Sequence, residues 1–154
     1  IETQLVGAYT SYTPTLTAST TSPTLGTGSS ATGYYRQIGR MVHGYASIVW
    51  GSSGTAAGSG YYGLLLPVVP ANRDQAIGIG YLLDYDDHVR FVVASAVVAV
   101  DLWAAATKKA IIVVTNTAGS GFVTGDNPVG AATPWAWSAN DKILLNFSYE
   151  ASTP

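Results

Sequence analysis

This chain of 154 residues contains no cysteine, and charged residues make up only 10% of it. The lack of cysteine excludes disulfide bridges, thiolate metal sites and thiol nucleophiles. The charged fraction is low, because about 25% is usual in soluble domains. A formal net charge of −2 leaves no positive surplus to attract nucleic acid or an anionic membrane. We therefore expect no nucleic acid among the partners and no membrane insertion.

Helical periodicity and long apolar runs are also lacking. No long stretch repeats apolar residues at the helical period, while β-branched and aromatic residues are common throughout. The most apolar segment, 91–106, is interrupted by Ser95 and Asp101, so it falls short of the roughly 18 uninterrupted apolar residues of a membrane span. A hydrophobic content of 47% is still ample for one folded domain with a core.

What the chain does contain is strict alternation of apolar and polar residues, the pattern of a strand with one buried face. In 141–150, the residues expected to be buried are Ile143, Leu145, Phe147 and Tyr149, with Leu144 as the exception on the polar side. Segment 76–85 is expected to bury Ile77, Ile79, Tyr81 and Leu83 in the same way. An Asp86-Asp87 turn then leads into an antiparallel strand at 88–95.

Further strands are predicted at 12–18, 34–38, 41–50, 61–67, 98–104 and 111–115. Segments that carry Gly or Pro separate them, at 24–33, 51–60, 68–74 and 117–130. The Thr-rich opening is interpreted as an edge strand, where Pro14 is tolerated, followed by an extended surface arm. About eight to nine short antiparallel strands predict an all-β fold, a β-sandwich or jelly roll.

The expected organisation is a single β-sandwich domain over residues 12–151. Residues 1–11 are interpreted as an N-terminal linker or the continuation of a longer chain, and 152–154 as a tail. Because the chain begins with Ile1 rather than Met, we expect it to be a piece of a longer polypeptide.

The segment 33–51 combines four aromatic residues with one histidine and two arginines. It predicts two strands joined by a tight turn at Gly39-Arg40. On the second strand, the residues predicted to face the core are Val42, Ala46, Ile48 and Trp50. The opposite face carries His43 and Tyr45, which we interpret as a candidate subunit contact.

No arrangement of residues specifies catalysis, and we expect no enzyme, no cofactor and no metal. His43 has no Ser or Asp motif beside it, and His88 lacks the histidine spacing of a zinc site. A Ser-His-Asp site assembled from distant loops is the alternative. Asp84, Asp86 and Asp87 could offer oxygen ligands to Ca²⁺, but a hairpin turn is the preferred interpretation, because Asp suits turns.

Aromatic residues near the loops suggest sugar binding, because exposed rings stack on the apolar faces of sugars. The candidate glycan-binding residues are Trp135, Trp137, Trp50, Tyr61 and Tyr62. The alternative is core packing, since Trp is highly buried on average.

Several motifs, among them YTP, LGTG, GYYRQIG and the ending PWAWSANDKILLNFSYEA, resemble the terminal β-domains of tail, baseplate and tail-fibre proteins of long-tailed bacteriophages. The likeness is greatest to phages of actinobacterial and other Gram-positive hosts. It covers the chain from Tyr12 to Ala151, least well in the middle. It implies a domain at the end of a longer virion protein, commonly trimeric, that serves receptor recognition or assembly, with no fixed ligand residues.

From these observations we expect a non-enzymatic virion protein of the phage tail or fibre that binds a host cell-surface glycan. Its expected partners are its own copies in a homotrimer, other phage tail proteins and the glycan. The apolar residues on both faces of 89–115 favour an oligomer, because large exposed apolar patches are rare on monomers. The alternatives are a purely structural capping, trimerisation or capsid-decoration module, and a carbohydrate-binding module of a secreted glycosidase.

Overall fold

The computed structural model describes residues 8–71, 75–86, 92–98, 109–117 and 123–154, and this part of the chain contains strands and no helix. No membrane-spanning helix is therefore found among the described residues. The strands are β1 (Thr10–Tyr12), β2 (Leu16–Ala18), β3 (Ser30–Ile38), β4 (Met41–Val49), β5 (Tyr62–Leu65), β6 (Gln75–Leu83), β7 (Val92–Val98), β8 (Lys109–Thr117), β9 (Val123–Pro128) and β10 (Lys142–Glu150).

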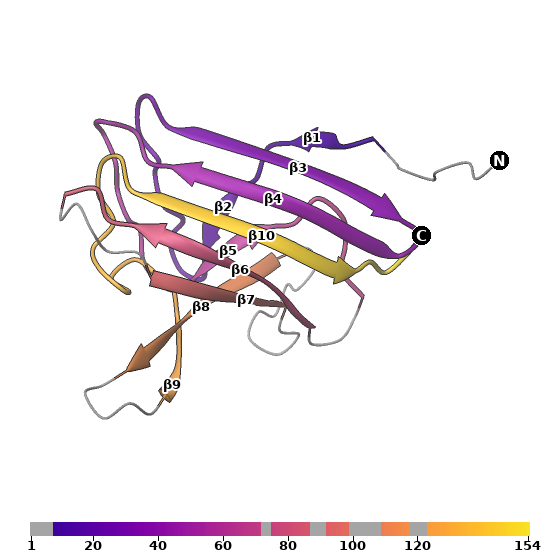
Figure 1. The fold of residues 1–154 in the computed structure, drawn as a ribbon. Coiled ribbons are helices and arrows are strands. Elements are labelled where there is room, and N and C mark those ends of the chain that lie inside the picture. Colours follow the sequence, from indigo (N-terminus) through magenta and orange to yellow (C-terminus); the bar gives the residue numbers. More distant parts are fainter. Residues whose placement is uncertain (1–7, 72–74, 87–91, 99–108, 118–122) are drawn as a thin grey trace.

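All neighbouring strands pair antiparallel, in the order β1-β3-β4-β10-β6-β7-β8-β5-β2, and β9 pairs with β8. Figure 1 shows β1, β3, β4, β10 and β6 as one layer, with β2 and β5 behind it. Tyr62 of β5 contacts Trp50, which follows β4, with ring centroids 6.2 Å apart. The sheet thus curls into two facing layers, and the predicted all-β antiparallel class is confirmed.

The core fills the space between these two layers. Every core position predicted on 141–150 is buried on β10, and Leu144 faces outward as expected. The turn predicted at Gly39-Arg40 is also confirmed, because Ile38 pairs with Met41 and Gly39 has a φ of 58°. From β4 and its end, the buried residues are Val42, Ala46, Ile48 and Trp50, as predicted. Simple alternation therefore predicted the inward face of both strands correctly.

The strand predicted at 12–18 is two strands in the structure. β1 ends at Tyr12 and pairs with β3, whereas β2 begins at Leu16 and pairs with β5. Pro14 lies between them and has no N–H for a ladder hydrogen bond. The chain therefore crosses from one layer to the other within three residues.

The prediction for β6 is partly wrong. Ile77 is buried as expected, but Ile79 is 64% exposed and Leu82 is fully buried. A bulge between Ala76 and Gly78 shifts the register, so the following alternation points the other way. The inward positions then fall to glycines, where a Cβ at Gly78 would collide with the backbone of β10.

β6 and β7 form the predicted antiparallel pair. Residue 87 of the predicted turn and 88–91 of the following strand lie outside the described residues. Most of the strand predicted at 98–104 also lies outside the described residues. β9 falls in a segment predicted to be a connection, where Gly125 and Pro128 argued against a strand.

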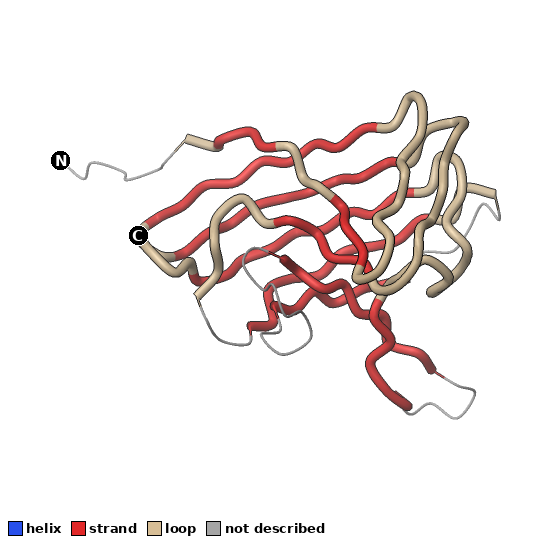
Figure 2. The backbone as a smooth tube through the Cα atoms, turned by 180° about the vertical axis from the view of Figure 1, so that it is seen from behind, coloured by secondary structure: helices blue, strands red, loops and turns tan. Residues whose placement is uncertain are grey.

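The Gly-rich separators predicted at 24–33 and 51–60 in fact pair with each other, and the pairing extends back to Thr21. Antiparallel bridges join Thr21 to Ser59, Thr24 to Ala56 and Thr27 to Ser53. Their backbone hydrogen bonds run in both directions across the pair, for example from Thr24 N to Ala56 O (2.8 Å) and back from Ala56 N to Thr24 O (2.9 Å). Figure 2 shows these loops gathered at one end of the molecule.

Candidate binding surface

Four of the five residues predicted to bind sugar lie in the core. Trp50 and Tyr62 have no exposed surface, Trp137 is 4% exposed and Trp135 is 9% exposed. Trp137 stacks on Trp50 at 4.7 Å and lies 5.2 Å from Trp135, between ring centroids. Tyr61, in contrast, is 56% exposed. In this structure the ring faces of the four buried residues are covered by protein, as the core-packing alternative describes.

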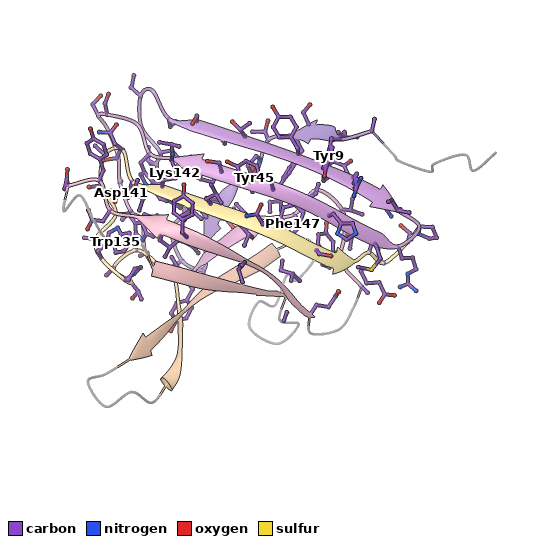
Figure 3. All side chains as sticks on the ribbon, in the orientation of Figure 1. Tyr9, Tyr45, Trp135, Asp141, Lys142 and Phe147 are labelled. Carbon is purple, nitrogen blue, oxygen red and sulfur yellow. The ribbon has the colours of Figure 1, made fainter. Side chains whose placement is uncertain are left out.

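A buried carboxylate, Asp141, holds this aromatic cluster in place. Its Oδ1 accepts a hydrogen bond from the N–H of Tyr85 (2.9 Å), and its Oδ2 accepts from the N–H of Ser138 (2.8 Å) and from Nε1 of Trp135 (3.3 Å). Burial raises the pKa of Asp141, while the hydrogen bonds from Tyr85, Ser138 and Trp135 oppose that rise. Figure 3 shows Trp135 and Asp141 together at the end of the layer where β10 begins. Asp141, directly before β10, therefore joins the residues that follow β6 to the loop that carries Trp135 and Ser138.

The outer face of the five-stranded layer brings together side chains from strands far apart in the sequence. A row runs across four strands from Tyr34 on β3 to Tyr45 on β4, Asn146 on β10 and Ile79 on β6. Tyr34 is 48% exposed, Tyr45 is half-buried, and Asn146 is exposed. We call this the tyrosine row; it contains one of the two residues predicted as a subunit contact.

A second row, which we call the basic row, lies two residues further along the same strands. It runs from Arg36 on β3 to His43 on β4 and Ser148 on β10. The Arg36 guanidinium lies 5.3 Å from the ring centre of Tyr9, within the range of a cation–π contact. Its Nε is buried and has no hydrogen-bond partner among the described residues. The predicted contact residues His43 and Tyr45 thus occupy adjacent rows of one surface.

Charge on this outer face is unevenly distributed. Arg36 lies towards one end, beside His43, and Lys142 lies towards the other. Among the outward positions of β3, β4, β6 and β10, the single acidic residue is Glu150. Its carboxylate is 3.2 Å from the guanidinium of Arg40. The face is therefore net positive on a chain whose formal charge is −2.

This surface can bind a ligand by ring stacking and hydrogen bonding, which suits sugars. The sequence did not single out Tyr34, Asn146 or Ile79 for this role. Alternation did place Asn146 outward, but which residues share a row depends on strand pairing. Ile79 reaches the surface because of the bulge in β6.

Among the described residues, no group of three or more His, Asp or Glu side chains is placed to hold a metal ion. Oδ1 of Asp84 accepts from the N–H of Asp86 (3.2 Å), as in a local turn, and Oδ2 of Asp86 accepts from Ser138 Oγ (3.0 Å). Asp87 and His88, the other candidate ligands, lie outside the described residues.

Comparison with protein-family models, with curated proteins and with solved structures found no match for this chain.

Proposed function

We propose that this chain is a non-enzymatic virion protein, the terminal domain of a phage tail or fibre protein, and that it binds a glycan of the host cell surface. The virion assignment rests on the sequence motifs that resemble such domains. The finer architectural class, a jelly roll, belongs to the same proposal.

The observation that supports glycan binding is the tyrosine row. Tyr34 and Tyr45 are cross-strand neighbours on a broad sheet face, and Asn146 continues the row with an exposed amide. Rings on a flat surface can stack on successive sugars, and an amide can hydrogen-bond to hydroxyl groups. The buried Trp50 and Trp137 lack such an exposed face.

The binding part of the proposal is tested on a glycan array and on host cells with Tyr34→Ala and Tyr45→Ala. Each loss of a stacked ring should weaken binding about two- to tenfold. The comparison variant is Tyr61→Ala, because Tyr61 is similarly exposed but lies outside the outer face. If only Tyr61→Ala loses glycan binding, the binding site lies in the loops rather than on the outer face. The absence of any glycan binding by the wild type would overturn the proposed function. Antibody labelling of virions, seen by electron microscopy, tests the virion location.

A second candidate function is a structural module that assembles through this same face. It is favoured by the exposure of Ile79 (64%) and Met41 (43%), because exposed apolar side chains are typical of interfaces. This candidate retains the predicted subunit contact at His43 and Tyr45. Light scattering tests it: a homotrimer has three times the chain mass of 16.0 kDa. A monomer whose mass does not change with concentration would exclude it.

A further inference from the structure

The basic row adjoins the tyrosine row on the outer face and suggests which glycans this face would select. Two residues along a strand correspond to about 7 Å. A charged substituent on a sugar stacked over Tyr45 would therefore lie within reach of Arg36 and His43. The exposed Ser148 adds a hydroxyl donor in the same row. A ring-binding surface and an anion-binding group thus stand side by side.

We propose that the outer face binds an anionic glycan, one that carries carboxylate or phosphate groups, with the anionic group held by Arg36, His43 and Ser148. This inference rests on the proposed function, because it specifies the class of glycan. Two features support it. The face is net positive on an acidic chain, and its one acidic residue is paired with Arg40.

Tyr9 prepares Arg36 for this role. The guanidinium lies over the Tyr9 ring, which restricts the motion of a long side chain before any ligand binds. A guanidinium held in place loses less conformational entropy on binding and matches the planar geometry of carboxylate and phosphate. The arrangement is therefore better suited to an anion than a freely moving lysine would be.

The test uses the intact chain and three probes: a polygalacturonate oligosaccharide, its fully methyl-esterified form, and a poly(glycerol phosphate) chain that carries glucose. The methyl ester has the same sugar backbone without the charge. We expect the anionic probes to bind at least about tenfold more tightly than the methyl ester, and increasing salt to reduce the difference. The ratio between the two anionic probes distinguishes carboxylate from phosphate as the preferred group.

Arg36→Gln and His43→Gln should each weaken binding of the preferred anionic probe by about tenfold. The matched control is Lys142→Gln, which removes a positive charge from the same face about 20 Å away along β10; its affinity should change less than twofold. Unchanged thermal unfolding of each variant excludes misfolding as the cause, and His43→Gln remains informative if Arg36→Gln fails to fold.

The outcomes separate this inference from the proposed function. Equal binding of the acid and its methyl ester would overturn the anionic selectivity and leave glycan binding standing. Binding of a DNA duplex of matched charge as tightly as the anionic glycans would also overturn it, since charge alone would then explain the affinity. No binding of any array glycan or probe, charged or neutral, would overturn both.

Discussion

Trp50 and Trp137 are stacked, with ring centroids 4.7 Å apart and ring planes 19° from parallel. Trp50 follows β4 directly, while Trp137 belongs to the loop that precedes β10. Nε1 of Trp137 also donates to the carbonyl oxygen of Gly130 at 2.9 Å. The stack therefore joins the five-stranded layer to a long loop, and it makes this loop part of the core.

Replacing Trp137 with alanine should lower the free energy of unfolding by about 3–5 kcal/mol, because it removes a buried ring and leaves a cavity. Urea denaturation measures the change. The Tyr61→Ala substitution, at an exposed position, should change the free energy of unfolding by no more than about 0.5 kcal/mol. A Trp137→Ala variant with wild-type stability and lost glycan binding would restore the sugar-platform interpretation of this residue.

Asp141→Asn should lower the free energy of unfolding by about 1–3 kcal/mol. One side-chain oxygen becomes an NH₂ group, so buried donors from Tyr85, Ser138 or Trp135 lose their acceptor. Asp86→Asn is the control, since Asp86 is exposed and accepts from Ser138. Equal effects of the two substitutions in chemical denaturation would contradict the central role of Asp141.

Alkaline pH should destabilise the fold through buried tyrosines. Burial raises the pKa of Tyr62 and Tyr149 above the ordinary value for a phenol, so both stay protonated in the folded state after the unfolded chain has ionised. Above about pH 10 the unfolded state then binds fewer protons, and stability falls by about 1.4 kcal/mol per pH unit for each such residue. Chemical denaturation between pH 9 and 11.5 should show this slope, and Tyr149→Phe should reduce it. An unchanged slope in Tyr149→Phe would contradict the prediction.

Tyr12 and Tyr149 should respond differently to removal of the hydroxyl at neutral pH. The hydroxyl of Tyr149 donates to Val68 O at 2.8 Å, whereas the buried hydroxyl of Tyr12 has no partner among the described residues. Tyr149→Phe should cost about 1 kcal/mol, and Tyr12→Phe should be neutral or stabilising. Thermal and urea unfolding of the pair compare them directly, and a larger loss in Tyr12→Phe would show that its hydroxyl is bonded in solution.

Removal of Ca²⁺ should not change stability. The carboxylates of Asp84 and Asp86 accept hydrogen bonds from Asp86 N–H and Ser138 Oγ, which suits a turn. Treatment with EDTA should therefore leave the melting temperature unchanged. A decrease of several degrees would show that a bound ion stabilises the native state.

The sequence by itself determined the all-β class, the inward face of β10 and the hairpin of β3 and β4. Each of these depends on local chemistry. Side chains alternate between the faces of a strand, and glycine readily adopts the positive φ found at Gly39. The separation of core from surface on β4, with Val42 inward and His43 outward, follows from the same rule.

Tertiary structure decided which strands are neighbours, and with them the candidate site. Alternation could not foresee the bulge that exposes Ile79, since a bulge is a property of the pairing between two strands. Nor could it determine whether Trp137 faced solvent or Trp50, because that depends on how a loop folds back on the layer. The tyrosine and basic rows exist because β3, β4 and β10 pair in one register, which joins residues more than a hundred positions apart. Local patterns orient a side chain, whereas long-range hydrogen bonding between strands decides which side chains it meets.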